Sequence, residues 1–137
     1  MRKIRGCMEF AEKLKNIRIS KGWSQEEVAE RSGISRRTIQ NYESGNMLPK
    51  KRSTYTVLAD TFGVEEAVLL DSNIDFVLRA NEQYGDSAMR QAMDLVADVK
   101  ALWAGGEMAE EDMDEIMRSL QEAYLEAKQK SSGRKRK

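Results

Sequence analysis

Apolar side chains recur at helical spacing through residues 9–21, the first patterned stretch of the chain. Phe10, Leu14 and Ile17 lie three or four positions apart in EFAEKLKNIRISK, with charged residues between them. A period of 3.6 residues places these apolar side chains on one face of a helix. Gly22 follows the last turn, where glycine commonly ends a helix. The pattern therefore predicts a first helix over 9–21.

Two shorter helices are predicted next, separated by the three residues GIS. In WSQEEVAERSG, Ser24 stands three positions before Glu27, a capping box in which each side chain satisfies a free backbone donor of the first turn. This second helix covers about 25–32 and stops at Gly33. Ser35 caps a third helix, RRTIQNYES, which ends at the next glycine.

Two further helices complete an all-α globule in the first half of the chain. One face of a fourth helix, in STYTVLADTFGV, carries Tyr55, Leu58, Ala59 and Phe62. A fifth, short helix over about 65–70 supplies Val68, Leu69 and Leu70. Five short helices within about 65 residues make contacts that are local in sequence.

The composition changes at residue 71, where a connecting segment over 71–85 begins. Two longer amphipathic runs, 86–104 and 110–130, follow it, and two glycines and several acidic residues lie between them. Two such runs joined by a short turn predict a helical hairpin. The apolar stripes are formed by Met89, Met93, Val96, Val99, Leu102 and Trp103 in the first run and by Met113, Ile116, Met117, Leu120, Tyr124 and Ala127 in the second.

Narrow stripes on two helices cannot be covered completely within the pair, so the N-terminal globule or a second chain must cover the remainder. We expect this hairpin to support dimerisation. Five of the eight methionines lie between Met89 and Met117. Core or dimer packing is the favoured interpretation of these flexible side chains, and an adaptable groove for a partner protein is the alternative.

Charge is distributed unevenly, although 23 basic residues balance 23 acidic ones. Residues 1–52 contain 13 Lys and Arg against 6 Asp and Glu, whereas residues 71–130 contain 6 against 14. Such asymmetry between two halves indicates two tasks on one chain. The basic half is the one suited to a polyanionic partner.

Other features disfavour whole classes of function. The chain has no histidine and a single cysteine, Cys7, so it lacks the commonest metal ligand and general base and has no internal disulfide. Without a Gly-rich phosphate loop or clustered carboxylates, we expect no enzyme, metal or cofactor. Apolar runs of four or five residues do not span a membrane, and no apolar signal-peptide segment follows the basic start. We expect a cytoplasmic protein without a membrane partner.

The two short helices around GIS are typical of a helix-turn-helix reader of the DNA major groove. Ile39 and Tyr42 face the interior, which leaves the arginine pair Arg36 and Arg37 outside. The arginine fork matches two acceptors of guanine. Two arginines at a helix N-terminus cost up to ~1 kcal/mol against the helix dipole, a penalty that an anionic duplex would reverse. A solvated charged surface is the alternative to DNA contact.

The stretch LKNIRISKGWSQEEVAERSGISRRTIQNYESGNMLP resembles the Cro/CI-type helix-turn-helix domain of phage and bacterial repressors, the XRE family. The resemblance covers residues 9–70 and implies a five-helix lambda-repressor-like domain that binds operator DNA as a dimer. The base-reading positions of the family are occupied here by Arg36, Arg37 and Asn41, and the flanking, supporting or backbone-contacting positions by Ser35, Thr38, Gln40 and Ser44.

The resemblance also implies supporting roles for three residues. Gln25, at the start of the second helix, is expected to touch a phosphate and brace the third helix, and a plain first-turn residue is the alternative. Arg18 and Glu43 match a pair that forms a partly buried ion pair between the first and third helices of relatives. Such a pair fixes orientation and reads no sequence.

Basic residues beyond the third helix are candidates for backbone contact. Lys50, Lys51 and Arg52 lie just after it and are expected to reach phosphates, each of which steepens the salt dependence by about 0.9 in the log-log slope. A solvated loop is the alternative. The terminal RKRK is interpreted as a solubilising tail rather than a further DNA contact.

Together these features predict a sequence-specific transcriptional regulator, a repressor that binds a two-fold symmetric operator in double-stranded DNA as a homodimer. The alternative is an antitoxin or interaction module of the same fold whose C-terminal helices bind a partner protein. The expected parts are a basic extension (1–8), the helix-turn-helix domain (9–70), the connecting segment (71–85), the hairpin (86–130) and a disordered basic tail (131–137). Because the family-like sequence begins at MEFAEKLK, Met8 is an alternative start.

Overall fold

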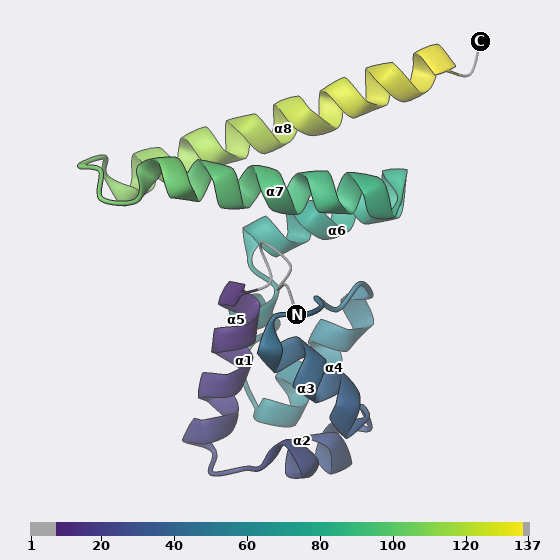
Figure 1. Ribbon diagram of the computed structural model, residues 1–137, viewed down its shortest axis with the longest axis vertical. Helices are drawn as coiled ribbons and strands as arrows, with labels where there is room; N and C mark the ends of the chain where they lie inside the picture. The colour runs from purple at the N-terminus through teal and green to yellow at the C-terminus, as the bar shows by residue number, and fades with distance from the viewer. Residues whose placement is uncertain (1–7, 136–137) are drawn as a thin grey trace. The chain divides into compact units, whose positions relative to one another are not determined.

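The computed structural model describes residues 8–135, and every regular element in that range is a helix (Figure 1). The prediction of an all-α chain is therefore confirmed. Two compact units are present, one ending at Leu78 and the other beginning at Arg79. The helices are α1 (Met8–Ser20), α2 (Gln25–Ser32), α3 (Arg36–Ser44), α4 (Arg52–Phe62), α5 (Glu66–Leu69), α6 (Ser72–Tyr84), α7 (Asp86–Trp103) and α8 (Glu110–Lys135).

Aromatic side chains from three helices form the centre of the first unit. Phe10 of α1 meets Tyr42 of α3 and Tyr55 of α4 edge-on, with ring centroids 6.0 and 5.5 Å apart. Both contacts have the T-shaped geometry that the ring quadrupole favours. The buried Tyr55 hydroxyl donates to the carbonyl oxygen of Pro49 at 2.8 Å, so it satisfies its own polar group and fixes the loop before α4.

The turn between α2 and α3 is set by caps on both sides. Gly33 ends α2 with φ of +79°, a left-handed conformation that glycine adopts without steric cost. Ser24 caps the start of α2, its Oγ accepting from the Glu27 N–H group at 3.0 Å. The capping box is only half formed, because the Glu27 carboxylate accepts from Arg31 at 3.1 Å instead of reaching back to Ser24.

The segment after α4 differs from the prediction in two respects. The fifth helix covers only Glu66–Leu69, and of its three expected apolar side chains Leu69 alone is buried, Val68 being 42% exposed. The connecting segment is the helix α6, and its first half belongs to the core of the first unit through Ile74, Phe76 and Leu78. The boundary between units thus falls within α6 rather than at residue 70.

The second unit contains the predicted hairpin of α7 and α8. Met89, Met93, Val96 and Val99 of α7 are buried, as is Met117 of α8. The Tyr124 hydroxyl of α8 donates to the side-chain oxygen of Gln91 on α7 at 2.7 Å. No helix between residues 8 and 135 is both long and apolar enough to cross a membrane.

The two ends of the chain are described only in part. Of the expected basic extension over 1–8, only Met8 lies within the described residues, as the first residue of α1. Cys7 lies outside them. At the other end, α8 continues to Lys135, so most of the segment expected as a disordered tail is helical, and its last two residues lie outside the described range.

The glycine at the turn gives a prediction about stability. An alanine at Gly33 meets no atom within 4 Å, so only the left-handed backbone opposes it. Gly33→Ala should lower the free energy of unfolding by about 1 kcal/mol, Gly33→Asn by less and the β-branched Gly33→Val by more. Urea denaturation followed by circular dichroism measures the series. Equal losses for Asn and Val would contradict a backbone origin.

Candidate nucleic-acid interface

The helix α3 has one buried side and one solvent-facing side. Ile39 and Tyr42 are buried in the first unit, and burial raises the pKa of the Tyr42 hydroxyl above its ordinary value. Gly45 ends the helix with φ of +81°. Because the buried residues occupy adjacent positions on the helical wheel, the side chains on the remaining arc point away from the core.

The exposed side of α3 carries the arginine pair. Arg36, Arg37 and Gln40 are all exposed, and neither arginine has an ion-pair partner among the described residues. Asn41 and Ser44 are half-buried at the edge of the same side. The Ser44 hydroxyl donates back to the Asn41 carbonyl oxygen at 3.1 Å. The structure thus brings the expected base-reading residues onto one short helix with their polar groups accessible.

Ser35 and Thr38 organise the first turn of α3. The Ser35 hydroxyl oxygen accepts from the Thr38 N–H group at 3.2 Å, as a helix cap, and its O–H group donates to Thr38 Oγ1 at 2.9 Å. Since Thr38 Oγ1 accepts this bond, its own proton remains available to an acceptor outside the protein. The predicted role of Ser35 as the cap of α3 is therefore confirmed.

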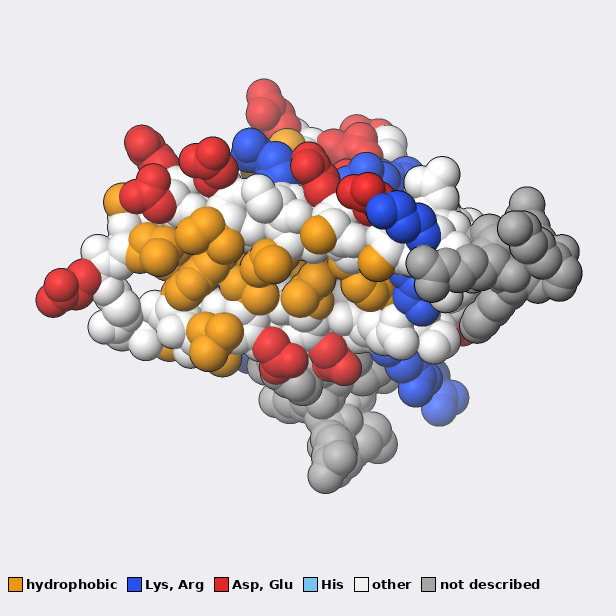
Figure 2. All heavy atoms as spheres, turned by 90° about the horizontal axis from the view of Figure 1, so that it is seen from above, with side chains coloured by type: hydrophobic (Ala, Val, Ile, Leu, Met, Phe, Trp, Pro, Cys, Tyr) orange, Lys and Arg blue, Asp and Glu red, His pale blue; other side chains and the backbone are white. Residues whose placement is uncertain are grey.

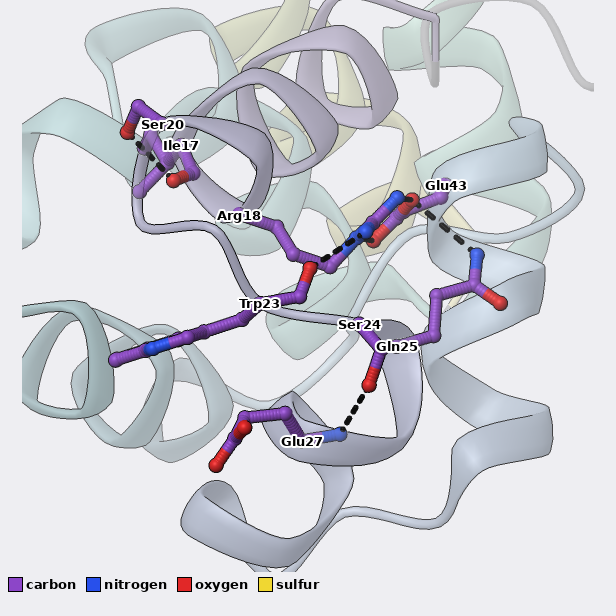
Figure 3. A network of polar contacts seen from close by, with 8 residues as sticks. All are labelled: Ile17, Arg18, Ser20, Trp23, Ser24, Gln25, Glu27 and Glu43. Carbon is purple, nitrogen blue, oxygen red and sulfur yellow. Dashed lines mark hydrogen bonds and ion pairs between the residues drawn. The ribbon is translucent and has the colours of Figure 1, made fainter.

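Three donors from α1 and α2 converge on Glu43 of α3 (Figure 3). The Arg18 guanidinium donates to both carboxylate oxygens, from Nε at 2.7 Å and from Nη2 at 2.9 Å. Gln25 Nε2 approaches one of these oxygens at 3.3 Å from the opposite side. The two charged side chains expected to pair are thus in bidentate contact, with only 13% of Arg18 and 4% of Glu43 exposed.

This contact is electrostatically strong because it is shielded from water. The hydrogen bond to Glu43 raises the pKa of the Arg18 guanidinium above its ordinary value, although desolvation acts in the opposite direction. A bidentate arginine–carboxylate contact also fixes relative orientation, since both donors and both acceptors are in one plane. The pair consequently fixes the rotation of α3 about its own axis relative to α1.

Trp23, to which the sequence pattern gave no role, connects the start of α2 to α1 and α4. Its carbonyl oxygen accepts from Arg18 Nη1 at 2.8 Å, and its ring stacks on Phe62 at 5.8 Å between centroids. The Arg31 guanidinium lies 4.3 Å from the centre of the Trp23 ring, a cation–π arrangement. A tryptophan between two short helices was the available signal, because so large a side chain is seldom left without a packing partner.

The basic run after α3 separates into two kinds of residue. Lys50 and Lys51 are exposed, and Lys51 is the residue that precedes α4. Arg52 is instead the first residue of α4, and its Nη1 donates to Asp75 of α6 at 2.6 Å. A carboxylate of the same unit thus already engages the Arg52 guanidinium, and a contact between Arg52 and a phosphate stays a prediction.

The contact between Arg18 and Glu43 yields a prediction about folding. Glu43→Gln leaves the largely buried guanidinium without a counter-charge and should lower the free energy of unfolding by about 3 kcal/mol. Arg18→Met should cost a similar amount, and the double variant should cost less than the sum of the two. Chemical denaturation of all four proteins measures this coupling. Additive losses would mean that the ion pair contributes no coupling.

Comparisons with known proteins agree with this geometry. The helix-turn-helix family HTH_3 matches residues 14–69. The SPbeta prophage-derived uncharacterized HTH-type transcriptional regulator YonR of Bacillus subtilis (strain 168) is 33% identical over 110 residues, which are 79% of this chain and 89% of that protein. The cryptic phage CTXphi transcriptional repressor RstR of Vibrio cholerae is 35% identical over 74 residues, 52% of this chain and 66% of that protein.

No solved structure matches the chain with significance. The family match covers α2 and α3 together with most of the residues that hold them, including Arg18, Gln25 and Glu43. The regulator from Bacillus subtilis aligns over most of its own length as well. The chain therefore belongs to the XRE-type helix-turn-helix family of DNA-binding transcriptional regulators.

Proposed function

We propose that this protein is a sequence-specific transcriptional repressor that inserts α3 into the major groove of its operator. One observation carries the proposal: Arg36 and Arg37 are exposed at the start of a helix whose opposite side is buried and whose orientation is fixed by Glu43. Helix-turn-helix proteins contact base edges with the N-terminal residues of this helix. The repressor named among the relatives supports repression as the regulatory outcome.

The side chains on α3 suit distinct parts of the groove. Arg36 and Arg37 can each donate two hydrogen bonds to the O6 and N7 atoms of guanine. Asn41, four or five positions along the helix, suits the donor and acceptor pair of adenine. Gln40 lies on the exposed side between them and supports these contacts. These assignments make α3 the source of sequence preference.

Contacts to the phosphate backbone come from the surrounding elements. Gln25 uses one Nε2 hydrogen to brace Glu43 and retains a second for a phosphate at the start of α2. Thr38 has a free hydroxyl proton at the start of α3, and Ser35 and Ser44 flank the same surface. Lys50 and Lys51 add positive charge beyond α3. Such contacts set register and affinity without reading sequence.

A homodimer bound to a two-fold symmetric operator completes the proposal. One short recognition helix reads only a few base pairs, and a second copy on an adjacent half-site doubles the contacts. Half-sites would lie one helical turn apart, or a multiple of it. The hairpin of α7 and α8 is the proposed dimerisation element. A partner protein bound by this hairpin is the competing proposal.

The arginine at the start of α3 provides a test of sequence reading. Arg36→Ala should weaken binding to the preferred duplex by about 1–3 kcal/mol and blur the preference at one base pair. The duplex is first selected from random DNA with the unaltered protein, and affinities are then measured by fluorescence anisotropy. Arg118→Ala, which removes an exposed arginine from α8, is the matched control and should leave affinity unchanged. Equal losses for Arg36→Ala on selected and random duplexes would refute base reading.

The lysine before α4 provides a separate test of backbone contact. Lys51→Ala should weaken all duplexes alike and reduce the slope of log affinity against log salt concentration by about 0.9. Arg52→Ala is the comparison, because loss of its contact with Asp75 should lower stability while leaving the slope nearly unchanged. A titration over several salt concentrations distinguishes the two. An unchanged slope for Lys51→Ala would exclude it from the DNA contact.

A further inference from the structure

An exposed row of apolar side chains runs along α8, and the proposed DNA contact does not use it. Met117 and Gln121 are buried in the second unit, whereas Ile116 is 40% and Leu120 39% exposed. Ala123 and Ala127 continue this row at helical spacing and are also exposed. Figure 2 shows hydrophobic side chains as a continuous band over this face of the molecule.

Two large apolar side chains outside α8 are also exposed. Leu102 near the end of α7 is 81% exposed, and Met108 in the turn before α8 is 43% exposed. Single exposed apolar residues are ordinary, but a continuous row bordered by polar residues marks a surface that another molecule covers. The hairpin of α7 and α8 therefore leaves one apolar side of α8 exposed to solvent, and this side is the candidate contact surface.

Charge is arranged asymmetrically along the same helix. Residues 110–119 contain five acidic residues and one basic residue, whereas residues 123–131 contain two basic residues and one acidic residue. In Figure 2 acidic side chains surround one end of the apolar band and also border its middle, and most of the basic side chains lie toward the other end. A helix with this pattern is complementary to a second copy of itself that runs in the opposite direction.

We propose that α8 pairs antiparallel with α8 of a second copy through the row Ile116, Leu120, Ala123 and Ala127. The inference rests on the proposed homodimer and specifies its contact surface and direction. Leu120 lies near the two-fold axis, where each side chain meets its own counterpart, as in any isologous interface. The acidic half of each helix then lies beside the basic half of the other.

Helical geometry identifies the charged pair that flanks this contact. Asp112 and Lys130 are 18 residues apart, which is five complete turns, so both side chains project in the same direction from α8. Antiparallel pairing about an axis near Leu120 brings Asp112 opposite Lys130 of the second copy, and the same contact forms again across the axis. Among the described residues of one chain, Lys130 pairs with Glu126 at 3.4 Å, with both side chains 67% exposed. Such a pair is weak and leaves Lys130 able to share a second carboxylate.

A partner of different chemistry fits this face less well. A uniformly basic partner would complement the first half of α8 and repel the second, and a uniformly acidic partner would do the reverse. An uncharged apolar peptide would leave both charged flanks unmatched. Only a partner with the same charge gradient in the opposite direction satisfies both halves, and a second copy of the chain supplies it.

The apolar row is tested on the full chain without DNA. The unaltered protein should sediment as a dimer, and Leu120→Glu should raise the dimer dissociation constant at least about a hundredfold, because two carboxylates would meet near the axis. Gln129→Glu is the control: it adds the same charge nine residues along, on the opposite side of α8, and should leave the dimer intact. A dimer that survives Leu120→Glu, or that Gln129→Glu disrupts equally, would overturn the assigned face.

The direction of pairing is tested by charge reversal, with circular dichroism to confirm folding. Asp112→Lys alone and Lys130→Glu alone should each weaken the dimer by about tenfold, since each places like charges in contact twice. The double variant Asp112→Lys/Lys130→Glu should recover the original affinity. Parallel pairing would instead leave Asp112 five helical turns away from Lys130 of the second copy, so Asp112→Lys alone would cause no loss. That outcome, or a double variant as weak as the singles, would overturn antiparallel pairing.

The same variants separate this inference from the DNA-binding proposal. Arg36→Ala should leave the sedimentation of the protein unchanged while DNA affinity falls. Leu120→Glu should leave the first unit folded and abolish the dimer, so its loss of operator affinity follows from the loss of the second half-site. An unaltered protein that remains monomeric at tens of micromolar would refute the α8 interface, whereas base reading by α3 would be judged from the Arg36 experiment alone.

Discussion

The orientation of α3 depends on a nearly buried carboxylate. Glu43 accepts both donors of the Arg18 fork and one from Gln25, so residues from α1 and α2 meet on a single side chain of α3. A carboxylate in such surroundings is stable only with its donors in place, which makes the arrangement cooperative. Apolar packing through Ile39 and Tyr42 holds α3 against the core, but it tolerates small rotations that a bidentate contact does not. The direction in which Arg36 and Arg37 project from α3 therefore depends on the contact between Arg18 and Glu43.

The basic residues near α3 divide into those that hold the helix in place and those that remain exposed for the proposed DNA contact. Arg18 donates two hydrogen bonds to Glu43 and one to the Trp23 carbonyl oxygen, and its side chain is only 13% exposed, so it is poorly placed to reach a phosphate. Arg36 and Arg37 have no such partners among the described residues, so their donors remain available. Arg52 belongs with Arg18 in this respect because Asp75 engages it. The surroundings of a basic residue, rather than its charge, decide which role it can take.

Local signals made much of the fold predictable. Glycines with positive φ end α2, α3 and α4, and serines cap α2 and α3, so the boundaries of these helices follow from short-range chemistry. The pairing of Arg18 with Glu43 required the family resemblance, because their separation of 25 residues gives no periodic signal. The role of α6 was missed for a related reason. Its contacts to the first unit, such as that between Asp75 and Arg52, are long in sequence and leave no mark in the amphipathic pattern.

Two polar residues, Glu27 and Arg52, have a partner in the structure that the sequence analysis did not predict. Glu27 was expected to complete a capping box, but Arg31, one turn along, offers an opposite charge and is itself held by the Trp23 ring. An ion pair at i and i+4 then replaces a bond to a neutral N–H group that water can satisfy equally well. Arg52 was expected to reach a phosphate, and the fold brings Asp75 within hydrogen-bonding distance of its guanidinium. Sequence spacing predicts which nearby residues can pair with a polar side chain, but only the tertiary structure shows when a residue distant in sequence pairs with it instead. On α8 the ion pair between Lys130 and Glu126 is exposed, and the proposed pairing with a second copy would give Lys130 a further carboxylate.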